Sequence, residues 1–224
     1  MIGFYDYTVV LTYMSLASST VGMMLAINGH FRLAITCLAL SGLLDMFDGK
    51  VARTKKNRSD DEKMFGVQID SLCDAICFGF FPALLCYSIG MRGIMAILVM
   101  VYYCIAAVIR LAFFNVLEMN RQRKEGGANK FYHGLPVTSI AIILPIVFLS
   151  NFILSEKIFY WALLATLIVT GTLFIVDFKL KKPNNKQLLA LVLLVSFVLG
   201  IAWCYNQFVV AHPPQIEPLL IEQR

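Results

Sequence analysis

Four aspartates stand near the ends of two neighbouring apolar segments, where a carboxylate is out of place unless it has a chemical role. Asp45 and Asp48 lie at the end of the first segment, and Asp70 and Asp74 lie near the start of the second. Spacings of three and four residues place each pair on one face of a helix. Because consecutive antiparallel helices can bring these faces together, we expect the four carboxylates to meet, where they would repel strongly in a low dielectric.

Divalent cations would neutralise such a cluster. Carboxylate oxygens suit Mg²⁺ or Mn²⁺, and two ions in one cluster would lie about 3.5–4 Å apart, an arrangement that holds phosphates. Small residues on the same helices leave room for a bulky ligand, and one arginine would counter phosphate charge. These residues are Gly49, Ala52, Gly66 and Arg53. Any single aspartate could instead pair with a lysine or face water, so the prediction rests on the set of four.

The helices that carry these aspartates are expected to lie in a membrane. A composition of 59% hydrophobic and only 15% charged residues, with a mean hydropathy of +0.74, excludes a water-soluble globular protein. A helix needs about 20 mostly apolar residues to cross a bilayer. Seven stretches can do so with some tilt, namely 7–28, 31–47, 66–89, 93–115, 135–153, 159–178 and 187–208. We therefore predict an all-α, polytopic integral membrane protein.

Basic residues are distributed unequally between the two sides of these helices. Three links, within 50–63, 121–130 and 179–186, carry 14 basic residues, whereas the opposite side carries four. By the positive-inside rule the basic links and the N-terminus are cytoplasmic, in a multi-pass protein of the cell membrane. The start has no basic region typical of a cleavable signal, so 7–28 is expected to remain as the first helix. The basic face suits anionic lipid headgroups, and we expect no nucleic-acid partner.

The segment from residue 45 to residue 74 resembles a known signature. It reads DMFDGKVAR, then 12 residues, then GVQIDSLCD. This is similar to the pattern D-x2-D-G-x2-A-R-x8-G-x3-D-x3-D of the CDP-alcohol phosphatidyltransferase family, with all eight fixed positions present. The 12-residue gap is longer than the usual eight, which a loop can absorb at a small entropic cost.

The resemblance implies a six-helix core, a homodimer, and transfer of a phosphatidyl group from CDP-diacylglycerol to a small alcohol with release of CMP. It implies that Asp45, Asp48 and Asp70 are metal ligands and that Asp74 is both a metal ligand and the general base. It also implies that Gly49, Ala52 and Arg53 contact the CDP moiety. We expect one integral-membrane domain over 1–224, with a catalytic core at 1–180 and an additional helix and tail at 181–224.

Two further motifs favour serine as the acceptor. Residues 110–115 read RLAFFN and residues 131–136 read FYHGLP. They are similar to RLARFN and F-x-G-L-P-x-P of the phosphatidylserine synthase branch, although Phe113 and Thr138 depart from those patterns. Arg110 would bind the serine carboxylate or a lipid phosphate, or would snorkel to the interface.

Two hydroxyls of the first predicted helix, on Thr12 and Ser15, could reach the nucleotide or could bond to their own helix backbone. Two other functions remain open. One is the same reaction with glycerol 3-phosphate, an inositol phosphate or another alcohol as acceptor. The other is a cation transporter that uses acids inside the membrane, which would place the acids near the bilayer midplane.

Overall fold

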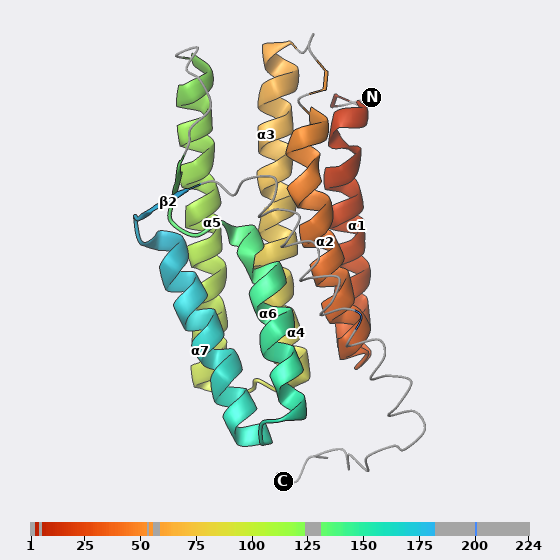
Figure 1. Cartoon of the computed structure of the whole chain (residues 1–224), viewed down its shortest axis with the longest axis vertical. Helices are drawn as coiled ribbons and strands as arrows, with labels where there is room; N and C mark the ends of the chain where they lie inside the picture. Colours follow the sequence, from red (N-terminus) through yellow and green to blue (C-terminus); the bar gives the residue numbers. More distant parts are fainter. Residues whose placement is uncertain are drawn as a thin grey trace.

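The computed structural model describes residues 3–4, 6–52, 54–55, 59–123, 131–181 and 200. Six helical rods make up nearly all of this part of the chain, and they run alternately up and down (Figure 1). The rods are α1 (Val10–Ile27, after the short helix Tyr7–Val9), α2 (Phe31–Ala52), α3–α4, α5 (Ile94–Arg123), α6 (Ile140–Leu149) and α7 (Glu156–Ile175). The predicted all-α fold is confirmed.

The third rod is interrupted in its middle. It consists of α3 (Asp60–Asp74), a wider π-helical turn (Ala75–Phe80) and α4 (Phe81–Ile89). α6 is likewise flanked by two short turns of tighter 3₁₀ helix, Val137–Ser139 and Ser150–Phe152. Two short antiparallel strands, β1 (Phe131–His133) and β2 (Lys179–Lys181), pair the segment before α6 with the segment after α7.

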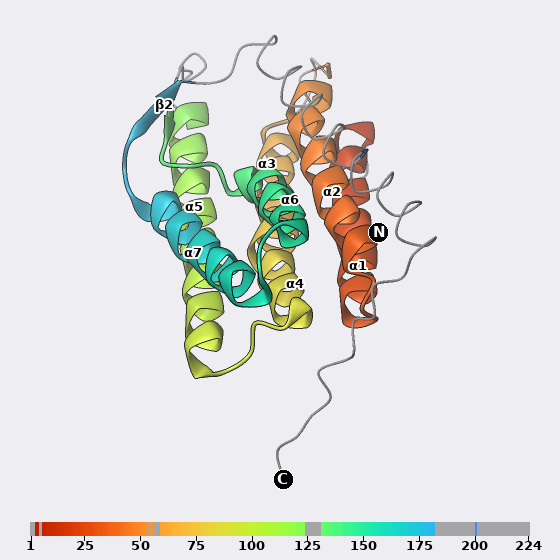
Figure 2. The ribbon, with the colours of Figure 1, turned by 60° about the horizontal axis from the view of Figure 1, so that its bottom comes forward.

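The rods pack as two connected groups. α1 lies along α2 and also contacts α4, whereas α5 contacts α3, the π-helical turn and α7. α6 joins the groups because it packs on both α2 and α7 (Figure 2). The α3–α4 rod therefore contacts helices of both groups and has its most buried side chains, including Phe78 and Phe81, in the middle of the core.

The outer surface is apolar, as expected for helices in lipid. Ile94, Met95 and Trp161 are 70%, 69% and 58% exposed. Four helical segments of the described residues are long and apolar enough to cross a membrane: Tyr7–Ile27, Asp60–Ile89, Ile94–Asn120 and Glu156–Ile175. Together with the composition, they identify a multi-pass membrane protein.

The other predicted spans differ from these four. α2 carries charged residues at both ends, and the apolar helix Val137–Leu149 is short. Both belong to the bundle, since α2 packs on α1 and α6 packs on α2 and α7. The predicted seventh span at 187–208 lies outside the described residues, apart from residue 200.

Small residues let α1, α2 and α6 approach closely. A Cβ added at Gly42 of α2 would lie 2.5 Å from the Cβ of Ala141 on α6. Between α1 and α2, the buried hydroxyls of Ser15 and Ser19 lie 2.7 and 2.8 Å from the hydroxyl of Ser41. Small residues and buried hydroxyl bonds are what hold helices together in lipid, where apolar burial gives little driving force.

Candidate metal centre

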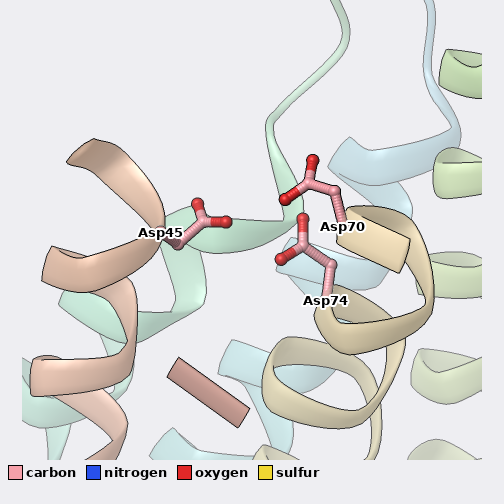
Figure 3. Close-up of side chains that lie close together, drawn as sticks. All are labelled: Asp45, Asp70 and Asp74. Carbon is pink, nitrogen blue, oxygen red and sulfur yellow. The ribbon is translucent and has the colours of Figure 1, made fainter. Parts of the chain in front are cut away.

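Three of the four predicted aspartates meet in one cluster. Asp45 projects from α2 toward Asp70 and Asp74 on α3 (Figure 3). One carboxylate oxygen from each lies within 4.8 Å of the others. Oxygens at such separations can share one cation, because Mg²⁺ binds oxygen at about 2.0–2.1 Å and larger hard cations at about 2.3–2.6 Å.

Asp48 adjoins this cluster. Its carboxyl lies close to that of Asp70, as the carboxyl of Asp45 does to that of Asp74. The Thr12 hydroxyl on α1 donates a hydrogen bond to Asp48 Oδ2 at 3.1 Å. The structure therefore brings all four aspartates together from two consecutive helices, as their spacing predicts.

The cluster has the properties of a cation site. Asp74 is only 9% exposed, and Asp70 Oδ1 is buried without a hydrogen-bond partner among the described residues. None of the four aspartates forms an ion pair with a basic residue in the part of the chain that the structure describes. Four buried or half-buried carboxylates without countercharge would be costly, and hard divalent cations are the partners that an all-oxygen donor set prefers. The donor set thus fits Mg²⁺ or Mn²⁺.

The surface beside the cluster is open where a ligand was expected. Gly49 is exposed on α2, and a Cβ added to it would meet nothing within 4 Å. Ala52, the last residue of α2, and Gly66, in the middle of α3, are half-buried. Arg53 lies outside the described residues, so its predicted contact with the CDP moiety remains a prediction.

The two hydroxyls predicted to reach the nucleotide both contact α2. Thr12 bonds to Asp48, and Ser15 bonds to the carbonyl and hydroxyl oxygens of Ser41 at 3.1 and 2.7 Å. Thr12 is therefore placed to orient a cluster carboxylate. Ser15 belongs to the contact between α1 and α2, and nucleotide binding by either residue remains a prediction.

Arg110 is buried on α5, 6% exposed, so its side chain does not snorkel to the surface. Its Nε donates to the carbonyl of Leu135 at 3.2 Å. The neighbouring Gly134 has a φ of +74°, and a Cβ there would lie 3.0 Å from the carbonyl oxygen of Val176. Arg110 and the end of α7 thus hold the Gly-Leu-Pro segment, so the motifs at 110–115 and 131–136 are in contact in this structure.

Two sets of contacts near the cluster were not predicted from the sequence. The Ser71 hydroxyl, between Asp70 and Asp74, donates to Asn115 Oδ1 at 2.6 Å. Asn115 is the last residue of the RLAFFN motif, and this membership is the only feature of the sequence that pointed to a role for it. In the link between α2 and α3, Lys55 bonds to Asp6 at 2.9 Å and to Glu62 at 3.2 Å, tying the N-terminal segment to the start of α3.

Comparisons with known proteins show which family the chain resembles. A family model described as CDP-alcohol phosphatidyltransferase matches residues 8–172. The chain is 32% identical over 109 residues to a CDP-diacylglycerol–serine O-phosphatidyltransferase of Saccharomyces cerevisiae, covering 48% of this chain and 38% of the relative. It is 34% identical to an archaetidylserine synthase of Methanothermobacter thermautotrophicus, covering 63% and 57%.

A longer match covers more of both chains. The chain is 28% identical over 176 residues to a CDP-diacylglycerol–serine O-phosphatidyltransferase of Methanocaldococcus jannaschii, covering 78% of this chain and 74% of the relative. By contrast, the chain spans only 38% and 57% of the length of the yeast and Methanothermobacter relatives. The match to these two relatives therefore concerns part of their length.

Proposed function

Because the chain belongs to the CDP-alcohol phosphatidyltransferase family, we propose that it transfers a phosphatidyl group from CDP-diacylglycerol to L-serine, giving phosphatidylserine and CMP. The observation that carries this proposal is the cluster of Asp45, Asp48, Asp70 and Asp74 inside a membrane-embedded helical bundle. Serine as acceptor is supported by relatives whose names specify serine transfer and by the paired motifs that Arg110 connects. A bilayer site suits a donor whose acyl chains remain in the membrane.

All four aspartates would be metal ligands, and one of them would also act as the general base. Asp45, Asp48 and Asp70 would hold two Mg²⁺ or Mn²⁺ ions, with Asp74 as a further ligand. Two such ions supply charge neutralisation at the pyrophosphate and at the departing CMP. The orphaned oxygen of Asp70 and the Thr12 bond that fixes Asp48 support this assignment.

Asp74 would also act as the general base. It lies one helical turn beyond Asp70, deeper along the third rod, where it can accept the proton of an alcohol approaching the lipid-side phosphorus. The alcohol oxygen then bonds to that phosphorus, the bond from phosphorus to the CMP oxygen breaks, and CMP leaves with the electron pair.

The remaining predicted residues would bind the substrates. Gly49, Ala52, Gly66 and Arg53 would line the CDP moiety, with Thr12 and Ser15 at its edge, and Arg110 would bind the serine carboxylate. The open space at Gly49 supports a ligand on this face of α2. The buried position of Arg110 supports a role in the protein interior.

The distribution of basic residues supports a cytoplasmic location for this site and for the N-terminus. We further propose that 1–180 forms the catalytic core of a single domain and that the protein acts as a homodimer. These two proposals rest on the family resemblance.

The purified protein should release CMP from CDP-diacylglycerol when serine is added. A panel of serine, glycerol 3-phosphate and inositol phosphate, with identification of the lipid product, tests the acceptor. Chelation with EDTA should abolish release, and Mg²⁺ or Mn²⁺ should restore it. If a lipid product forms with another alcohol and none forms with serine, the serine assignment is wrong. Full activity in excess EDTA would contradict the two-metal mechanism.

Paired substitutions separate the base from the ligands. Asp74→Asn keeps an oxygen ligand of nearly the same shape but cannot accept a proton, so turnover should fall by about 10²–10⁴-fold with donor binding better preserved. Asp48→Asn should weaken metal and donor binding together. Near-normal turnover in Asp74→Asn would show that the base is another group.

A further inference from the structure

We infer that Tyr103 is a positioning residue for Asp74, acting through the π-helical turn that follows this aspartate. The inference concerns a residue outside the cluster and rests on the proposed function of Asp74. Tyr103 lies on α5, is fully buried and belongs to no motif noted in the sequence.

The turn begins where the cluster ends. Asp74 is the last residue of α3, and the wider turn starts at the next residue and runs to Phe80. A π turn holds one more residue than an α turn, so the helix before it is rotated by about 100° relative to the helix after it. The rotation of Asp70 and Asp74 toward Asp45 therefore depends on this turn.

The sequence provides a local cause for the turn. Pro82, at the start of α4, has no N–H to donate to the carbonyl of Phe78 four residues earlier, and its ring would crowd that carbonyl in a regular α-helix. The π register is visible in the bond from the Phe81 N–H to the Ile76 carbonyl. Phe78, Phe81 and Pro82 are all buried, so α4 is anchored and the segment before it must take up the rotation.

α5 donates to two carbonyl groups of the turn. The Tyr103 hydroxyl donates to the Phe78 carbonyl at 2.6 Å, and the Cys104 thiol lies 3.5 Å from the Gly79 carbonyl. Buried carbonyl groups are rarely left without a donor, so Tyr103 favours the wide turn over other conformations of this segment. An added Cβ at Gly79 would lie 3.4 Å from the Cβ of Ala107, which shows how closely α5 approaches.

Asp74 is held between two contacts with α5. Ser71, three residues before it, bonds to Asn115, and Phe78, four residues after it, bonds to Tyr103. The two helices run in opposite directions, so these contacts brace one face of the third rod on either side of Asp74. From this stretch of the rod Asp70 and Asp74 extend toward Asp45 on α2 (Figure 3).

The test is Tyr103→Phe, which removes the hydroxyl and keeps the ring. Tyr102→Phe is the matched control, because the Tyr102 hydroxyl bonds to Thr172 on α7 at 2.9 Å and not to the third rod. Mn²⁺ affinity, measured by electron paramagnetic resonance of the free ion, should fall by about 10-fold or more in Tyr103→Phe and remain unchanged in Tyr102→Phe. Turnover should fall by about 10- to 100-fold while the KM for serine changes little.

Pro82→Ala provides a second test that does not depend on Tyr103. Alanine restores an N–H for the Phe78 carbonyl, so the turn should close and Mn²⁺ affinity should fall although the protein still folds. Unchanged Mn²⁺ affinity in Tyr103→Phe would overturn the inference, and so would unchanged affinity in Pro82→Ala, because the turn would then not position the cluster. No Mn²⁺ binding by the wild type would also overturn it. A wild type that binds Mn²⁺ but releases no CMP would contradict the proposed function alone, since the comparison of affinities still applies.

Discussion

The hydrogen bond from Thr12 to Asp48 allows a sharp test of how the cluster is organised. Thr12 is 5% exposed, and its hydroxyl lies 3.1 Å from Asp48 Oδ2. Thr12→Val removes the hydroxyl and nearly preserves the shape of the side chain. A hydrogen bond to a charged group contributes about 1.5–3 kcal/mol, which corresponds to about 10- to 150-fold in affinity. Loss of groups that orient metal ligands costs about 10- to 100-fold in metal affinity or activity, which is the same range.

Mn²⁺ affinity and kcat/KM for CMP release should therefore both fall by about 10-fold or more in Thr12→Val, and Thr12→Ser should restore most of the loss. Thr8→Val is a matched control. Thr8 lies one helical turn earlier, is also buried, and donates at 3.3 Å to Asp6, which is not part of the cluster. If Thr12→Val raises only the KM for the donor and leaves Mn²⁺ affinity intact, Thr12 contacts the nucleotide and does not orient Asp48.

Three other predictions follow from the packing, the ion pairs and the charge distribution. Gly42→Ala should lower the free energy of unfolding by about 1–3 kcal/mol because its Cβ would overlap α6, whereas Gly49→Ala should leave thermal unfolding nearly unchanged and weaken donor binding. The hydrogen bond from Lys55 holds the pKa of Asp6 below its usual range, so this pair contributes stability above the ordinary pKa of a carboxyl and loses it as the pH falls through the lowered value. The difference in thermal unfolding between wild type and Lys55→Met should accordingly disappear in acid. Asp61→Cys in a cysteine-free protein should react with an impermeant maleimide from the cytoplasmic side, and labelling from outside would invert the proposed topology.

The sequence predicts the four carboxylates well because their grouping is local. Spacings of three and four residues fix which side chains share a face, and a short link joins α2 to α3, whose aspartates then meet. The ends of these helices are predicted less well. α2 continues to Ala52, and α3 begins at Asp60, well before the predicted start at residue 66. Apolarity marks where a helix enters lipid and not where it begins.

The start of α3 does have a readable signal. Ser59 accepts from the Glu62 N–H at 3.1 Å, and Glu62 accepts from the Ser59 N–H at 2.8 Å, which is the capping box that the spacing of Ser and Glu predicts. The partners of Thr12, Arg110 and Tyr103 have no comparable signal. Each contacts a residue at least 25 positions away, so its partner is set by how the rods pack.

The position of all four carboxylates between residues 45 and 74 has a consequence for biosynthesis. The hairpin of α2 and α3 contains the whole cluster, whereas Asn115 and Tyr103, which brace it, belong to a helix made later. At about 5–20 residues per second, α5 is complete as far as Asn115 about 2–8 s after Asp74 is added. During that interval the nascent hairpin carries its acids without the support of α5. If the cluster binds a divalent cation as proposed, binding during that interval would lower the cost of placing these acids in the bilayer, and metal supply would then affect how efficiently the protein is inserted.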